Sequence, residues 1–180
     1  HFVQYLVKGG NFLNCVCLVE QNDWTNEDWS EQGDISELKN IFSDWHPEIQ
    51  EILESTKPGS LFKWGLHDRA PMNKWSKGRF SLLGDAAHPM LPFIAQGAAM
   101  AIEDGIVLAS SLSSFDSVAL GLNDYENKRK YRTAKAQKTA TRNATIFHLS
   151  DFFAFFRNLV MKFFIKKIMD SFYKYDAISK

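Results

Sequence analysis

The sequence has few cysteines, no excess of either charge and no long apolar run, and each absence excludes a class of protein. Lys plus Arg number 21, as do Asp plus Glu, so no bulk charge favours nucleic acid as a partner. No stretch approaches the roughly 18–20 apolar residues that span a bilayer, so we expect no transmembrane segment. The two cysteines, Cys15 and Cys17, are too few for a zinc site and too closely spaced for an ordinary disulfide. We therefore expect no metal site, and free thiols in a reducing cytoplasm.

The most informative segment is residues 79–105, where an apolar run meets a tight turn. Phe80 to Leu83 predicts a strand that ends at Gly84. Glycine lets the backbone turn sharply or approach a ligand without a Cβ in the way. Asp85 follows at once, where its carboxylate can accept hydrogen bonds from a sugar-like hydroxyl.

A stiff loop and a helix start follow this turn. Pro92, like Pro89 before it, fixes φ, and an Ala-rich helix is predicted to begin near Gln96. Because Gly97, Ala98 and Ala99 are small, a planar ring could lie close to the first helical turn, whose free N–H groups and dipole favour an anion. The alternative is a structural corner, in which Asp85 caps something local and the alanines pack against a neighbouring element.

A family resemblance bears on this choice. The motif resembles the second flavin-binding motif of the single-component FAD-dependent aromatic hydroxylases, most closely the salicylate hydroxylase-like branch. The residues that carry it are Gly84-Asp85-Ala86-Ala87-His88-Pro89, Pro92-Phe93, Ala95-Gln96-Gly97-Ala98 and Glu103-Asp104. Further similar segments are His1-Phe2-Val3 with Tyr5 and Gly9-Gly10, Lys63-Trp64 to Asp68-Arg69, Tyr125-Glu126 with Arg129, and Tyr173 to Asp176.

The resemblance implies an enzyme that uses FAD, with NAD(P)H as co-substrate and O2, to hydroxylate a phenolic or related aromatic acid through a flavin C4a-hydroperoxide. It implies that Gln96 positions the phenol oxygen and that His1 acts as its base. The residues it implies for cofactor binding are Gly84, Asp85, Pro92, Gln96, Gly97, Ala98 and Ala99. Two alternatives stay open: a flavin monooxygenase acting on a quinone precursor or isoprenoid, and a non-catalytic interaction module that keeps the fold.

One element of the family is missing from the sequence. Gly-x-Gly-x-x-Gly, which binds the FAD pyrophosphate in Rossmann-type flavoproteins, does not occur, and the chain opens at His1 inside an apparent strand. We therefore expect an α/β fold present as an α+β fragment: the C-terminal half of a Rossmann-type monooxygenase. We expect this fragment to be inactive alone. The expected parts are a substrate-sheet portion (1–78), an FAD-binding segment (79–115) and a C-terminal helical region (116–180).

Hydrophobic periodicity predicts the other N-terminal elements. Phe2–Val7 and Phe12–Glu20 read as a β-hairpin, and the second strand, apolar on both faces, as interior to a sheet. Residues 21–33 read as an exposed connection. Asp34 is predicted to cap a helix, with Glu37 as its capping-box partner and Leu38, Ile41, Phe42 and Trp45 as the buried stripe. A short helix follows Pro47, and Leu61–Arg69 is predicted to be a strand.

Helices are predicted from Ala95 to about Leu112 and from about Ser117 to Leu149. The second is basic, which indicates a solvated face or, less favoured, attraction of an anionic cofactor; its cations are Lys128, Arg129, Lys130, Arg132, Lys135, Lys138 and Arg142. Eight of the 15 phenylalanines fall between Phe147 and Phe172. They favour a homodimer contact or packing against another domain over a membrane surface.

Two polar residues receive structural interpretations. His88, between small residues and Pro89, is expected to hydrogen-bond to the backbone rather than transfer a proton. Arg69, next to Asp68, is expected to form half of a structural ion pair rather than a carboxylate clamp.

Overall fold

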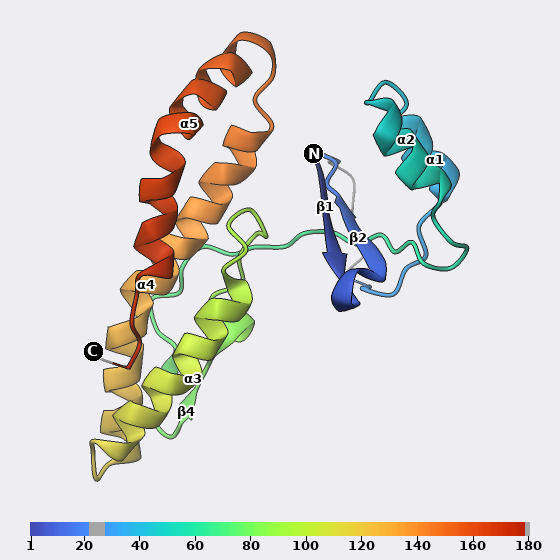
Figure 1. Ribbon diagram of the computed structural model, residues 1–180. Coiled ribbons are helices and arrows are strands. Elements are labelled where there is room, and N and C mark those ends of the chain that lie inside the picture. Colours follow the sequence, from blue (N-terminus) through green and yellow to red (C-terminus); the bar gives the residue numbers. More distant parts are fainter. Residues whose placement is uncertain (22–27, 179–180) are drawn as a thin grey trace. The chain divides into compact units, whose positions relative to one another are not determined.

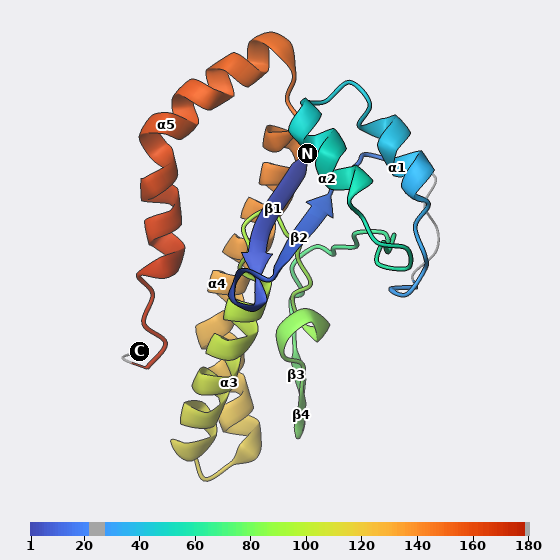
Figure 2. The ribbon, with the colours of Figure 1, turned by 45° about the vertical axis from the view of Figure 1, so that its right-hand side comes forward.

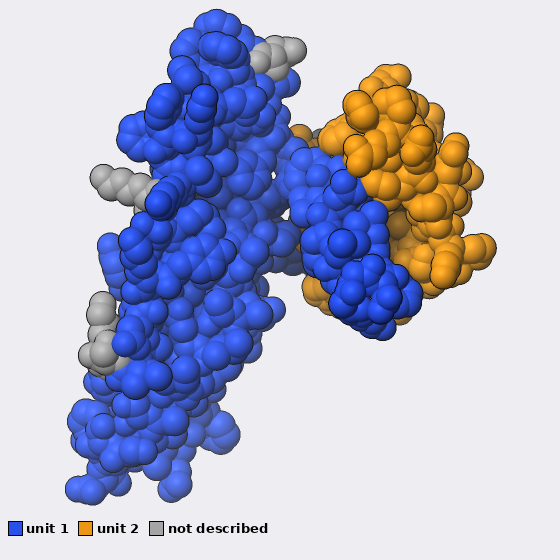
Figure 3. All heavy atoms as spheres, viewed as in Figure 1, with its two compact units in different colours: residues 1–17, 67–180 blue, residues 18–66 orange. Residues whose placement is uncertain are grey.

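The computed structural model describes residues 1–21 and 28–178 and divides into two compact units (Figure 3). Unit 1 comprises His1–Cys17 and His67–Lys180, and unit 2 comprises Leu18–Leu66. The predicted connection at 21–33 lies partly outside the described residues. Helices and short strands are both present, which confirms a mixed fold.

The chain begins with a β-hairpin in unit 1. Strand β1 (Phe2–Val7) pairs antiparallel with β2 (Phe12–Cys17) across a short 3₁₀ turn, η1 (Lys8–Gly10). The hairpin was predicted, but β2 ends three residues before Glu20. Among the described residues β2 pairs only with β1, and Phe12 and Leu13 are exposed, so the interior position expected for β2 is not found there.

A second, smaller hairpin leads into the flavin-like motif. β3 (Ser76–Lys77) and β4 (Phe80–Ser81) pair antiparallel across Gly78. The predicted Phe80–Leu83 strand is therefore shorter, because the chain enters the 3₁₀ turn η2 (Gly84–Ala86) directly after Leu83.

Two long helices form the body of unit 1. α3 (Gly97–Ser113) and α4 (Val118–Phe147) lie side by side (Figure 1) and agree with the predicted helices to within about two residues at each end. Gly121 permits their close approach, because a Cβ there would lie 3.1 Å from the Cα of Leu112. Two buried clusters, one including Trp75, Val107 and Tyr125 and the other Met100 and Ala136, pack at this helix pair.

The last helix, α5 (Asp151–Tyr173), follows α4 after a short loop (Figure 2) and forms hydrogen bonds with α4 and this loop near both of its own ends. At one end Arg157 Nη1 donates to the carbonyls of Phe147 (2.8 Å) and Leu149 (3.2 Å), where α4 has carbonyls without helical partners. At the other end Arg132 Nη2 donates to the carbonyl of Phe172 (3.0 Å). Phe172 is buried, whereas Phe152, Phe153, Phe155, Phe156, Phe163 and Phe164 are exposed.

Unit 2 contains α1 (Ile35–Ile41) and α2 (Pro47–Glu54). Asp34 caps α1 as predicted, accepting from the Ser36 N–H at 2.7 Å. Glu37 instead contacts Lys63 Nζ at 2.7 Å. Of the predicted stripe, Phe42 is buried, while Ile41 and Trp45 are largely exposed.

The strand predicted at Leu61–Arg69 is wrong. Only a single bridge forms there, between Gln32 and Phe62, with backbone bonds from the Gly33 N–H to the Leu61 carbonyl and from the Lys63 N–H to the Glu31 carbonyl, both at 3.0 Å. Among the described residues no helix is long and apolar enough to cross a membrane.

Candidate cofactor site

The turn at Gly84 requires glycine for two reasons. Its φ is +58°, in the left-handed region, and a Cβ would lie 3.2 Å from the Cβ of Ala101 on α3. Its carbonyl accepts the N–H groups of Ala87 and His88, both at 2.9 Å. The turn is therefore rigid and lies against α3.

Asp85 follows this turn with an exposed side chain. Within residues 1–21 and 28–178, no hydrogen bond or ion pair of its carboxylate is found. The structural alternative, in which Asp85 caps a local group, is therefore not supported. A rigid backbone instead presents an acceptor that faces solvent.

The loop between turn and helix is held by amides of α4. Gln137 Nε2 donates to the carbonyl of Pro89 (3.0 Å) and Asn143 Nδ2 to that of Phe93 (3.1 Å). Ala95, whose N–H reaches the carbonyl of Pro92 (3.1 Å), has φ +50°. A positive φ is strained for a residue with a Cβ, and such strain is concentrated at functional sites.

Two residues at the start of α3, Gln96 and Gly97, are not required there by a capping bond or by close packing. Gln96 occupies the N-cap position and is 3% exposed, yet its side chain makes no capping hydrogen bond. A Cβ at Gly97 would find its nearest neighbour, Met90 Cγ, at 4.0 Å, so the chain itself leaves room for a side chain there. Of the next two residues, Ala98 is exposed and Ala99 half-buried.

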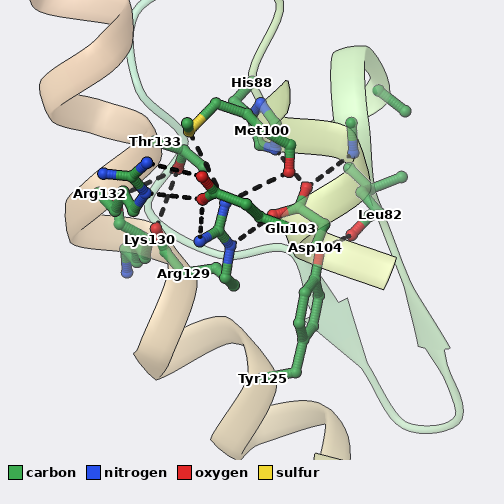
Figure 4. Close-up of polar contacts among 12 residues, drawn as sticks. Leu82, His88, Met100, Glu103, Asp104, Tyr125, Arg129, Lys130, Arg132 and Thr133 are labelled. Carbon is green, nitrogen blue, oxygen red and sulfur yellow. Dashed lines mark hydrogen bonds and ion pairs between the residues drawn. The ribbon is translucent and has the colours of Figure 1, made fainter. Parts of the chain in front are cut away.

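Behind this loop lies a buried cluster of charges (Figure 4). Asp104 of α3 accepts from the Gly84 N–H at 3.1 Å and contacts His88 Nε2 at 2.5 Å through Oδ2. Its Oδ1 accepts from Arg129 Nε at 2.7 Å. Neither Asp104 nor Arg129 has exposed surface, and Arg129 also lies 2.7 Å from Glu103. Glu103 in turn accepts two bonds from Arg132, each at 2.6 Å.

These contacts fix the charge of Asp104. Burial would raise the pKa of its carboxyl, but the hydrogen bonds from His88 and Arg129 outweigh burial, so the pKa lies below its ordinary value. Burial likewise opposes the charge of Arg129, and the two carboxylates outweigh it and raise its pKa. Asp104 is therefore a carboxylate at neutral pH.

The sequence pattern did not predict this cluster. The cations of α4 were expected to form a solvated face, but Arg129 is fully buried and Arg132 half-buried. His88 bonds to the Asp104 carboxylate rather than to backbone. The buried residues of α3 recur at helical spacing: Met100, Asp104, Val107 and Ser111. This pattern could have revealed that Asp104 lies on the buried face of the helix.

His1 lies apart from the helix start but next to the same loop. Its ring centroid is 5.3 Å from that of Phe93, and its Nδ1 is 3.3 Å from His148 Nε2. Because His148 Nδ1 faces the Ala144 carbonyl at 2.7 Å, it donates there, and its Nε2 accepts when the ring is neutral. His1 also lines an open hollow of about 390 Å³, with Val3, Phe147, Arg157, Asn158 and Met161. No contact between His1 and Gln96 is found among the described residues.

Arg69 does not form the expected ion pair with Asp68 among the described residues. Its Nη2 donates to the carbonyl of Ala86 (2.7 Å), while Asp68 accepts from Thr141 Oγ1 (2.9 Å). The Arg69 bond holds this segment to the motif, and the Asp68 bond holds it to α4.

Comparison with known proteins identifies the class. The family described as "FAD binding domain" matches residues 11–140. A 6-hydroxynicotinate 3-monooxygenase of Pseudomonas fluorescens is 40% identical over 149 residues, covering 79% of this chain and 37% of the relative. A 3-hydroxybenzoate 6-hydroxylase of Klebsiella oxytoca is 34% identical over 166 residues, covering 90% of this chain and 40% of the relative.

The fold agrees with a solved structure described as a salicylate hydroxylase substrate complex. The TM-score is 0.75 at 23% identity, over 98% of this chain and 45% of the other, which is a likeness of fold. The chain belongs to the FAD binding domain family, and it spans 37% and 40% of the two curated relatives. The family resemblance drawn from the motif is thereby confirmed.

Proposed function

We propose that this chain is the C-terminal part of an FAD-dependent monooxygenase that hydroxylates a phenolic or related aromatic acid. The observation that supports this best is that two features occur together. Asp85, whose carboxylate has no bond within the described residues, lies on a turn that favours glycine, and α3 begins at Gly97, where the described neighbours leave room for a side chain. The residues present fit FAD: Asp85 offers an acceptor for a ribityl hydroxyl, and Gly97 offers N–H groups of a first helical turn to an electron-rich ring edge.

Within this proposal the chain's residues have separate tasks. Gly84 and Pro92 set the backbone of the proposed flavin site. The small residues Gly97, Ala98 and Ala99 let the flavin ring approach the first turn of α3. Bound FAD would supply the chemistry that these residues lack, which is hydride acceptance from NAD(P)H and activation of O2. Gln96 orients the phenol oxygen of the substrate, and His1 takes its proton.

The substrate class follows from the relatives' names. Hydroxynicotinate and hydroxybenzoate are both aromatic acids that carry a hydroxyl group, which is the chemistry that Gln96 and His1 would recognise. On this proposal residues 1–78 contribute to substrate binding, 79–115 hold FAD, and 116–180 support both.

Two further properties belong to the proposal. The free thiols Cys15 and Cys17 fit a reducing compartment, so we place the enzyme in the cytoplasm. The exposed phenylalanines of α5 form an apolar surface of the kind that subunits bury, which supports a homodimer through this helix.

Asp85→Ala in the full-length protein tests the cofactor site. Loss of a charge-assisted hydrogen bond worth about 1.5–3 kcal/mol should weaken FAD binding roughly ten- to a hundred-fold, with the fold intact. FAD affinity is measured by flavin fluorescence and the fold by circular dichroism. Asp116→Ala, which removes another exposed carboxylate, should leave the affinity unchanged. Equal affinities for the Asp85 and Asp116 variants would remove Asp85 from the site.

A further inference from the structure

Asp104 joins the two segments that are proposed to hold the cofactor, although its own side chain is fully buried. It lies on α3 two turns beyond Gly97, and its Oδ2 accepts the N–H of Gly84 at 3.1 Å. We propose that Asp104 is a positioning residue, which sets the register of the Gly84-Asp85 turn against the first turn of α3. The proposal rests on the proposed function and adds a residue that touches neither cofactor nor substrate.

The chemistry of its partners requires a carboxylate. Three donors converge on Asp104: the Gly84 N–H, His88 Nε2 and Arg129 Nε at 2.7 Å. An ionised carboxylate only accepts, so it satisfies all of them, whereas an amide would turn its NH2 group toward one of the donors. His88 must therefore donate through Nε2.

The arrangement links the turn to two helices. His88 ties the far end of the turn to the same carboxylate oxygen that holds Gly84. Arg129, from α4, holds Asp104 and also donates to the Met100 carbonyl at 3.2 Å, one turn back toward Gly97. Because an α-helix rises about 1.5 Å per residue, the seven residues from Gly97 to Asp104 form a rigid spacer of about 10 Å. A shift of this anchor would move Asp85 relative to the helix start.

The simpler reading is that Asp104 only stabilises the fold. A second buried carboxylate provides the matched comparison: Glu126 Oε2 accepts the N–H groups of Trp75 (3.0 Å) and Ser76 (2.8 Å). It is likewise a buried carboxylate that accepts backbone N–H groups, 8% exposed against 0% for Asp104, but it anchors β3 rather than the motif. Both Asp104→Asn and Glu126→Gln should lower the unfolding temperature.

A double-mutant cycle on FAD affinity in the full-length protein separates the two readings. Asp104→Asn should weaken FAD binding by about tenfold or more, while Glu126→Gln should stay within about twofold of wild type. If Asp104 acts by placing Asp85, the effects of Asp104→Asn and Asp85→Ala are not independent. The double variant should then bind FAD about as weakly as the weaker single variant, whereas independent effects would multiply.

The outcomes distinguish the proposal from its premise. Multiplying effects, or FAD affinity that falls equally in the Asp104 and Glu126 variants, would overturn the positioning role while leaving FAD binding established. A wild-type protein that binds no FAD would overturn the proposed function, and with it this inference. If Asp104→Asn does not fold, His88→Gln takes its place in the cycle, since it alters one contact and leaves the Gly84 bond. It should also weaken FAD binding, to a smaller extent, and not independently of Asp85→Ala.

Discussion

At the residue scale, Gln96 occupies a capping position without capping the helix. It stands at the N-cap of α3, where side chains usually satisfy a free N–H, yet its amide makes no such bond and the residue is 3% exposed. On the proposed function, this amide acts on the substrate instead.

Gln96→Ala in the full-length enzyme should therefore affect the reaction rather than the cofactor. We expect FAD to be retained and reduced by NAD(P)H, but more hydrogen peroxide to be released per NAD(P)H consumed, because a misplaced phenol is hydroxylated less often. Peroxide and hydroxylated product are measured against NAD(P)H. Gln50→Ala, which removes an amide that donates to the Phe42 carbonyl in unit 2, should lower stability without added peroxide. Full coupling in the Gln96 variant would end its assignment as a catalytic residue.

At the scale of elements, α3 contains two glycines, the half-buried Gly97 at its start and the exposed Gly105 in its interior. Added Cβ atoms would find Met90 at 4.0 Å from position 97 and no atom within 4 Å at position 105. The protein therefore leaves room for a Cβ at both positions. If the flavin ring lies against the first turn, only Gly97→Val should lose flavin or its reduction by NAD(P)H. Absorbance of the purified full-length variants measures the bound flavin, and the same loss in both would show that helix propensity, not the ring, is responsible.

The elements also show what sequence alone could predict. The bounds of α3 and α4 follow from local helical periodicity, and the cap of α1 from Asp34, so these were found. The Leu61–Arg69 strand failed because a strand depends on a partner far along the chain, and only Phe62 finds one. For the same reason the Asp104–Arg129 pair was missed, since it joins residues 25 positions apart on different helices. The proposed cofactor-binding residues lie in one contiguous motif and could be predicted from it. The buried charges behind this motif are brought together only by tertiary packing.

At the scale of the molecule, we propose that the chain holds part of a cofactor site, and its sequence contains no Gly-x-Gly-x-x-Gly. That pattern places a pyrophosphate at a helix N-terminus and supplies much of the binding to a dinucleotide. The described residues contain two two-stranded sheets, and the chain spans 37% and 40% of its two curated relatives. On the proposed function, Asp85 and Gly97 contact only the flavin end of FAD.

The 180-residue polypeptide should therefore bind FAD weakly or not at all, even where circular dichroism shows its helices formed. The purified chain is mixed with FAD and desalted, and the flavin that remains is measured by absorbance. The full-length protein, treated in the same way, should retain close to one FAD per chain. The difference arises because contacts to the pyrophosphate and to the ribityl hydroxyls contribute jointly to one binding free energy, and losing the former leaves too little to hold the cofactor through desalting. Stoichiometric yellow protein from the 180 residues would show that they form a complete FAD site, and the interpretation of the chain as part of a larger enzyme would be wrong.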